Sequence, residues 1–264
     1  MSLRLTPSTP LLKVNWDKAR MLRDIRAGEL NDRHEPFPRY LLLNEVHDLL
    51  YTVEDQKRYL AMLLMFVTGA RVQELVQLKP SDFRLGESIS CVRLRTAKKR
   101  DHRKTRNKRH AEKLKAAGYD SADVSPSRWV PLPDEAIHKE IRSYIVTHKI
   151  KPQHRLFPVV TRTVQMWVSK AVESYNESAG HRRFDFPVSC HTFRHSFAMN
   201  ACLHGVPQRV LKEWLGHQSM ASTEIYLRLM QVDSYLVAEQ VSWRPPVEDV
   251  TATPNETYLL GDDD

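Results

Sequence analysis

Residues 190–198 read Cys-His-Thr-Phe-Arg-His-Ser-Phe-Ala, and this stretch decides how the whole chain is interpreted. If a helix begins here, His191, Arg194 and His195 fall at positions i, i+3 and i+4 and share one face. The apolar residues between them can then face a core. A helix with an ordinary solvated side satisfies the same pattern, so the stretch alone leaves the function open.

The spacing in this stretch argues against a metal site. His191 and His195 have the i, i+4 spacing of a zinc protease helix, but no Glu follows His191. Cys190 lacks further ligands at a spacing known for zinc. The three cysteines of the chain form no CxxC pair, which is typical of a reducing cytosol. We therefore predict that the protein uses no metal and no other cofactor.

A second motif, Leu215-Gly216-His217, is followed nine residues later by Tyr226 within Thr-Glu-Ile-Tyr. Gly216 allows a sharp turn at the end of a helix, which places His217 just beyond it. Tyr226 then falls on a short following helix. Taken by themselves, these residues favour a simpler interpretation, in which Tyr226 is buried with its hydroxyl satisfied and His217 lies on the surface.

A third motif reads Thr-Gly-Ala-Arg-Val-Gln-Glu-Leu over residues 68–75. Gly69 suits the end of one helix, and Arg71 suits the start of the next. Arg71 and Glu74 are three residues apart on one helical face. A structural salt bridge between them is the simplest interpretation of the pair in isolation.

The periodicity along the chain predicts a mainly α fold with a small antiparallel β-sheet. Alternating apolar and polar residues predict strands over 88–95 and 129–132. Asn44 and Ser189 are expected to cap helices. Helices are expected over residues 15–30, 44–50, 55–67, 72–78, 133–148, 162–178, 190–204, 207–216, 223–230 and 233–240.

The charge of the chain indicates a polyanionic partner. The 264 residues carry a formal net charge of +8. Six of the 32 acidic residues and none of the 40 Lys and Arg residues follow Arg244, so residues 1–244 carry +14. A body this basic most often binds nucleic acid. Twelve Lys or Arg residues lie from Arg93 to Lys115, and their place between two predicted strands favours a basic hairpin that grips a backbone over a solvated face.

Together the motifs resemble the catalytic domain of the tyrosine recombinase (phage integrase) family. The shared order is Gly-Ala-Arg-x-x-Glu-Leu, a basic hairpin, His-x-x-Arg-His, Leu-Gly-His and then Tyr nine residues later. The resemblance covers residues 40–240 and is specific, because five positions agree together with their local contexts. It implies the fold of that catalytic domain, and DNA cleavage through a 3′-phosphotyrosyl intermediate. This ester retains the bond energy, so rejoining would need no ATP.

The resemblance also implies a role for each matching residue. Tyr226 would attack phosphorus. Arg71 and Arg194 would hold the phosphate oxygens and stabilise the charge that develops on them. His191 would accept the phenol proton, and His217 would hydrogen-bond the scissile phosphate.

The predicted hairpin would supply the general acid for the 5′-oxygen, as a hairpin lysine does in the family. Lys98 is our choice, with Lys99 as the alternative because the register at the turn is open. Glu74 would orient its neighbours, and His195 is given no chemical role. Contacts to the DNA backbone are expected from Arg93, Arg95, Lys99, Arg103, Lys104, Arg106, Lys108 and Arg109.

The family usually carries an N-terminal core-binding domain that completes a clamp around DNA. Residues 1–38 are expected to form only a short helical segment and linker, residues 39–244 the catalytic domain, and residues 245–264 an acidic, disordered tail. The long basic hairpin would then replace part of the clamp. The expected partner is double-stranded DNA, bound by a homo-tetramer that assembles from monomers or dimers, with accessory DNA-bending proteins as further candidates.

The short N-terminal segment favours a plasmid- or transposon-type resolvase over a phage integrase. We expect it in the bacterial cytoplasm at the nucleoid or a plasmid, since no apolar run approaches the roughly 18 residues of a membrane helix. A type IB topoisomerase shares this chemistry, but the His-x-x-Arg motif and the spacing from Leu-Gly-His to Tyr favour a recombinase. The other alternative is a DNA-binding accessory protein that has lost catalysis. Every proposed catalytic position is filled in this sequence, which counts against that alternative.

Overall fold

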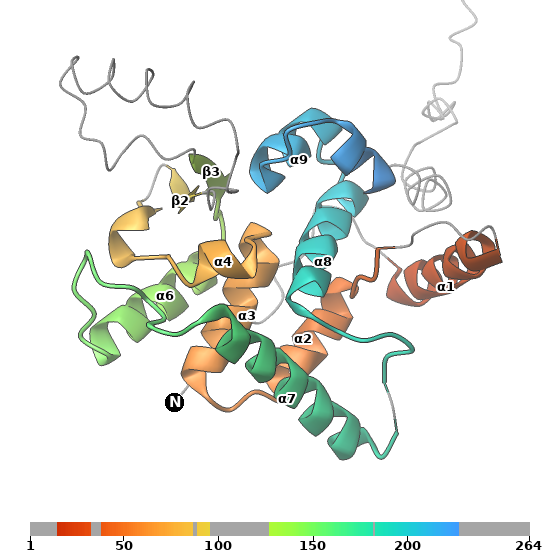
Figure 1. Cartoon of the computed structure of the whole chain (residues 1–264), viewed down its shortest axis with the longest axis horizontal. Helices are drawn as coiled ribbons and strands as arrows, with labels where there is room; N and C mark the ends of the chain where they lie inside the picture. The colour runs from red at the N-terminus through yellow and green to blue at the C-terminus, as the bar shows by residue number, and fades with distance from the viewer. Residues whose placement is uncertain (1–14, 33–37, 87–88, 96–126, 182, 227–264) are drawn as a thin grey trace, which may run out of the picture.

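The computed structural model describes residues 15–32, 38–86, 89–95, 127–181 and 183–226, and Figure 1 shows a mainly helical body with a small sheet. This is the fold class that the sequence predicted. None of the described helices is long and apolar enough to cross a membrane. The helices are α1 (Trp16–Asp32), α2 (Leu43–Tyr51), α3 (Gln56–Thr68), α4 (Val72–Leu75), the 3-10 helix η1 (Pro80–Asp82), α6 (Glu135–Thr147), α7 (Thr161–Ala179), α8 (Cys190–Leu203) and α9 (Gln208–Leu215). Residues 221–226 form a further short helix.

Three short strands form an antiparallel sheet in the order β1 (Phe83–Leu85), β2 (Ser90–Arg95) and β3 (Ser127–Pro131). Val92 of β2 lies opposite Val130 of β3, and both are fully buried because this face of the sheet packs on the core. β2 and β3 are the two strands that the alternating pattern predicted. β1 has no such signal, because three residues are too few to show a period of two.

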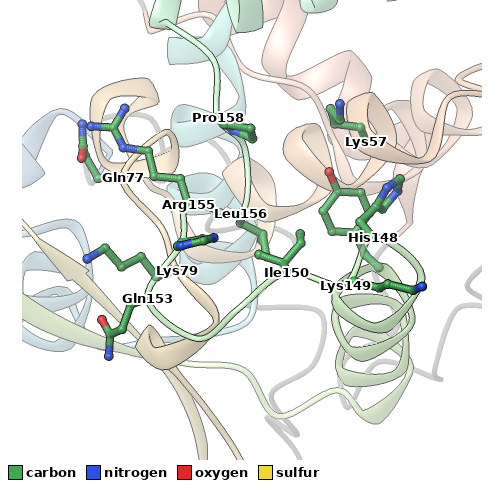
Figure 2. A pocket seen from close by; sticks show the side chains of 12 residues that line it. Lys57, Gln77, Lys79, His148, Lys149, Ile150, Gln153, Arg155, Leu156 and Pro158 are labelled. Atoms are coloured by element: carbon green, nitrogen blue, oxygen red, sulfur yellow. The ribbon is translucent and has the colours of Figure 1, made fainter.

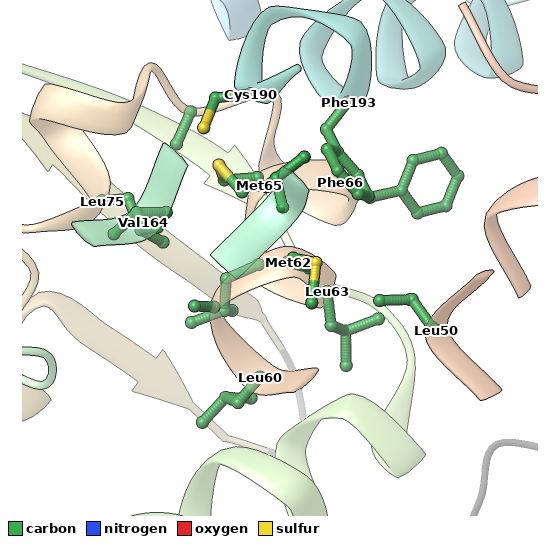
Figure 3. Packing of buried hydrophobic residues seen from close by; sticks show 14 of the residues in the cluster. Leu50, Leu60, Met62, Leu63, Met65, Phe66, Leu75, Val164, Cys190 and Phe193 are labelled. Carbon is green, nitrogen blue, oxygen red and sulfur yellow. The ribbon is translucent and has the colours of Figure 1, made fainter. Parts of the chain in front are cut away.

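Helix α3 is the centre of the main core. It packs against α2, α6, α7 and α8, and Figure 3 shows Met62, Met65 and Phe66 among side chains from neighbouring elements. The Asp55 carboxylate caps the helix by accepting the N–H of Arg58 at 2.8 Å. A helix that is apolar on nearly every side is stable only when buried on nearly every side, which fixes α3 inside the domain.

Helix α1 packs onto α8 in a second core cluster. Ala19 and Leu22 of α1 are buried there together with Met199 and Cys202 of α8. Tyr226 belongs to the same cluster and is 2% exposed. The second core therefore joins the first described helix of the chain to the last one.

A buried ion pair also joins α1 to α2. The guanidinium of Arg23 donates to both carboxylate oxygens of Glu45, at 2.6 and 3.1 Å, and to the carbonyl of Tyr40 at 3.3 Å. Glu45 also accepts the backbone N–H of Leu42 at 2.9 Å, and Leu42 is the N-cap of α2. The prediction that Asn44 caps this helix is therefore wrong, because the helix begins earlier and a carboxylate inside its first turn satisfies the N-terminal N–H.

Gly69 at the end of α3 is sensitive to substitution. Its φ is +60°, and a Cβ there would lie 2.5 Å from Cδ1 of Phe197. We expect Gly69→Ala to lower the free energy of unfolding by about 2–4 kcal/mol, since left-handed strain adds to overpacking. Gly180 has a φ of +69° with no atom within 4 Å of its added Cβ, so Gly180→Ala should cost only about 1 kcal/mol. Urea denaturation compares the two variants, and equal losses would contradict a clash at Gly69.

Candidate active site

Arg71 is placed by the turn between α3 and α4. It is the N-cap residue of α4, and its backbone N–H donates to Oε2 of Glu74 at 2.8 Å. Its Nη1 donates to Oε1 of the same carboxylate at 3.3 Å. The side chain of Arg71 is 35% exposed, whereas that of Glu74 is fully buried. The predicted salt bridge is present, and it leaves the guanidinium of Arg71 accessible to a ligand.

Arg194 is placed by α8 and joins the ends of two other helices. Its Nη1 donates to the carbonyl oxygen of Gly69, and its Nη2 to that of Leu215, each at 2.6 Å. Both carbonyls end helices, where carbonyl oxygens lack a partner within the helix. The residue is 4% exposed. The predicted face of α8 is thus turned toward the ends of α3 and α9.

Two predicted histidines lie against these arginines. Burial, followed by the charges of Arg194 and Arg71, lowers the pKa of His191 below its ordinary value. The same three causes lower the pKa of His217 to about 4, with Arg128 adding to them. Nδ1 of His217 lies 2.9 Å from the hydroxyl of Thr223. Both imidazoles are therefore neutral at physiological pH and can act as hydrogen-bond acceptors.

The hydroxyl of Tyr226 lies 2.9 Å from Nδ1 of His195. Burial raises the pKa of Tyr226 to about 12. Burial and then the charges of His191 and Arg194 lower the pKa of His195 to about 4. Both partners are thus uncharged, and they share one hydrogen bond whose direction depends on the tautomer of His195. The sequence prediction gave His195 no role. No local motif indicates that His195 faces Tyr226, because the two residues are 31 positions apart.

The structure brings Arg71, His191, Arg194 and His217 to one place. Arg71 and Arg194 act electrostatically on both histidines, and Arg194 also acts on the phenol of Tyr226. Two guanidiniums with neutral imidazoles beside them have the chemistry that a tetrahedral oxyanion needs from its binding site. Tyr226 borders this site, with its ring packed in the second core cluster and its hydroxyl bonded to His195.

Arg128 of β3 is a site residue that sequence reasoning missed. Its Nη1 and Nη2 each donate to one carboxylate oxygen of Glu74 at 2.8 Å, and its Nε donates to the carbonyl of Trp214 at 2.5 Å. These bonds, after the opposing effect of burial, keep the pKa of Glu74 below its ordinary value. The contact spans 54 residues of sequence, so no local pattern signals it.

Two of the predicted DNA-backbone residues have partners within the chain. Arg95 donates to Asp82 at 2.6 Å, and Arg93 lies 3.4 Å from the same carboxylate. Among the described residues, no group of three His, Cys, Asp or Glu side chains is placed to hold a metal ion. Outside the described residues lie Lys98, Lys99, Arg103, Lys104, Arg106, Lys108 and Arg109.

Comparison with known proteins identifies the family of the chain. The model of the phage integrase family matches residues 39–231. A protein named Resolvase from Escherichia coli K12 is 32% identical over 93% of this chain and 90% of its own length. Another Escherichia coli protein named Resolvase is 33% identical over 76% of this chain and 77% of its own length.

Solved structures share the fold. The XerH site-specific recombinase bound to its difH substrate superposes with a TM-score of 0.52 at 21% identity, over 75% of this chain. The chain covers about half of that structure, 53% of its length. The chain therefore belongs to the phage integrase family and is a site-specific tyrosine recombinase, as its motifs predicted.

The lowered pKa values predict how stability depends on pH. His195 and His217 have pKa values of about 4 in the folded protein, so the unfolded chain binds their protons first as pH falls. Their contribution is complete above about pH 6.5 and is lost between about 6.5 and 4, at up to about 1.4 kcal/mol per pH unit for each group. The urea midpoint of unfolding should fall as the pH is lowered across this range. His217→Gln should reduce the slope of the midpoint against pH. A wild-type curve without slope would contradict neutral buried imidazoles.

Proposed function

We propose that this protein breaks and rejoins DNA at a specific site through a covalent bond between Tyr226 and a 3′-phosphate. The observation that carries the proposal is the convergence of Arg71, Arg194, His191 and His217 on one site that Tyr226 borders. In this reaction the phenol oxygen attacks phosphorus, and the bond to the 5′-oxygen breaks. The 5′-oxygen leaves with a proton as a hydroxyl, and the reverse attack restores the strand.

Arg71 and Arg194 are proposed to hold the scissile phosphate. Arg194 uses two of its five N–H groups on the carbonyls of Gly69 and Leu215, which leaves others for a phosphate oxygen. Arg71 is partly exposed and bonded to Glu74. Permanent positive charge fixed before the reaction stabilises the transition state without reorganisation.

The histidines are proposed to manage the proton of Tyr226. His191 is assigned as the base and His217 as a phosphate hydrogen-bond partner, because both are neutral beside the arginines. Tyr226 is 2% exposed, so its side chain must turn out of the second core cluster to reach phosphorus. Lys98 remains our proposed general acid on sequence grounds.

Resolution of plasmid or transposon DNA is the proposed role within the family. Two relatives named Resolvase support it, one of them matching nearly the whole chain. Two strands must be cut at each of two sites, so we propose that four copies assemble on DNA from monomers or dimers. We place the protein at the nucleoid or a plasmid of a bacterial cell, with accessory DNA-bending proteins as possible partners.

Covalent trapping tests the nucleophile directly. Wild-type protein incubated with a nicked suicide substrate should form a protein–DNA adduct, and Tyr226→Phe should form none. Arg71→Gln and Arg194→Gln should each slow adduct formation by on the order of 10²–10³-fold, because each removes a donor to the transition state. Denaturing gels measure the adduct. An adduct that persists in Tyr226→Phe would disprove the assignment.

A second feature is a basic pocket of about 740 Å³ beside the start of α3. Figure 2 shows Lys57 of α3, Lys149 at the end of α6, and Arg155 and Lys79 on the opposite side. The twelve described residues that line it include no Asp or Glu. Cations gathered in one hollow repel each other, and a bound anion offsets that repulsion.

The backbone at Lys149 supports a role for its charge. Lys149 closes α6 with a φ of +49°, a position where Gly is usual. Its N–H donates to the carbonyl of Val146, and that of Ile150 to Ile145. The chain thus tolerates left-handed strain while keeping a cation at the pocket.

We infer that this pocket holds a second phosphate of the same DNA. Lys57 lies at the start of α3 and Arg71 just beyond its end, so the two sites are about 20 Å apart along a 13-residue helix. For a duplex that runs parallel to α3, 3.4 Å per base pair would place the pocket about six base pairs from the cut. The triple variant Lys57→Gln, Lys149→Gln and Arg155→Gln should lower the salt slope of DNA binding by about 2–3.

Lys139 is the matched control for the pocket. It is exposed on α6 and does not line the pocket, so Lys139→Gln should change the slope little. Affinity is measured by fluorescence anisotropy at several salt concentrations. A triple variant with the wild-type slope would show that DNA does not occupy the pocket.

A further inference from the structure

One guanidinium, that of Arg128, connects three parts of the site. Its two terminal nitrogens hold both oxygens of Glu74, each at 2.8 Å. Its Nε holds the carbonyl of Trp214 near the end of α9 at 2.5 Å. The side chain is 9% exposed. β3, α4 and α9 are therefore fixed to one another by a single planar group.

The partners of Arg128 lead to two proposed phosphate-binding residues. Glu74 fixes the position of Arg71 by accepting two hydrogen bonds from it, one from the backbone N–H at 2.8 Å and one from Nη1 at 3.3 Å. Trp214 lies three residues before His217, whose backbone N–H closes the end of α9 by donating to the carbonyl of Lys212 at 3.1 Å. Arg128 is thus connected to Arg71 through Glu74 and to His217 through the end of α9.

Packing at Gly216 supports the same connection. Gly216 has a φ of +63°, and a Cβ there would lie 3.0 Å from Cδ and 3.1 Å from Nη1 of Arg128. The turn that presents His217 therefore needs Gly for its backbone angle and also for the approach of Arg128. The glycine of the Leu-Gly-His motif and the arginine of β3 form one unit.

We propose that Arg128 is a positioning residue that sets Arg71 and His217 at the correct separation for one phosphate. It acts through Glu74 and through the end of α9, and it touches no reacting atom. This inference rests on the proposed strand cleavage. Lysine cannot replace it, because a single ammonium cannot form the planar fork to two carboxylate oxygens while it also reaches a third acceptor.

The test separates the cleavage step from DNA binding. Arg128→Lys keeps the charge but loses the fork. We expect single-turnover adduct formation at saturating protein to fall by on the order of 100-fold, since misplacement of about 1 Å can have that effect. The dissociation constant for the same DNA should change by less than about threefold, because the charge is retained.

The Arg23–Glu45 ion pair provides a matched control. Arg23 is 8% exposed, forks onto a buried glutamate and also donates to the carbonyl of Tyr40, and it has no assigned part in catalysis or binding. Arg23→Lys should lose stability to a similar extent as Arg128→Lys. Its cleavage rate per folded molecule should match the wild type.

A double-mutant cycle identifies the route. Glu74→Gln should slow cleavage, and adding Arg128→Lys should slow it little further, because both changes break the same connection. Three results would each overturn the inference. The first is an Arg128→Lys variant that cleaves at the wild-type rate, and the second is an equal loss of cleavage rate in Arg23→Lys. The third is a double variant in which the two losses of rate are fully additive. Failure of the wild type to form any adduct would instead overturn the proposed cleavage activity.

Discussion

The structure of the site depends on the two hydrogen bonds of Arg194 to helix-end carbonyls. Gly69 ends α3 and Leu215 ends α9, and the carbonyl oxygen of each, which lacks a helical partner, accepts a hydrogen bond from the same guanidinium. A cation there is favoured by both helix dipoles. Because these helices lead directly into Arg71 and His217, the buried cation that joins them also brings together the residues of the proposed phosphate site.

Concentrating positive charge in this way carries an electrostatic cost that the surrounding groups offset. Glu74 is the buried carboxylate among the described residues that faces Arg71 and Arg128, and it stays ionised despite its burial. The imidazoles respond in the opposite sense, since the same charges and burial lower the pKa of His217 and His195. The site therefore holds fixed cations next to neutral acceptors, which suits an anionic substrate whose reaction begins with loss of a proton.

Local pattern was enough to predict most helices, the two longer strands and the placing of His191 and Arg194 on one face. Ser189 takes the predicted N-cap position of α8, and its backbone N–H donates to the hydroxyl of Thr192. What could not be predicted are contacts between distant segments. Arg128 meets Glu74 across 54 residues, and His195 meets Tyr226 across 31. Neither pairing is indicated by a periodic pattern or a characteristic spacing in the sequence, because only tertiary packing brings the partners together.

The position of Tyr226 separates the proposed nucleophile from the proposed phosphate-binding arginines in this structure. Backbone carbonyls and Glu74 fix the two arginines, whereas the phenol is packed in the second core cluster. The hydroxyl is nonetheless bonded to His195, the residue next to Arg194 on α8. In the proposed reaction, the cost of removing one aromatic ring from the core would oppose attack.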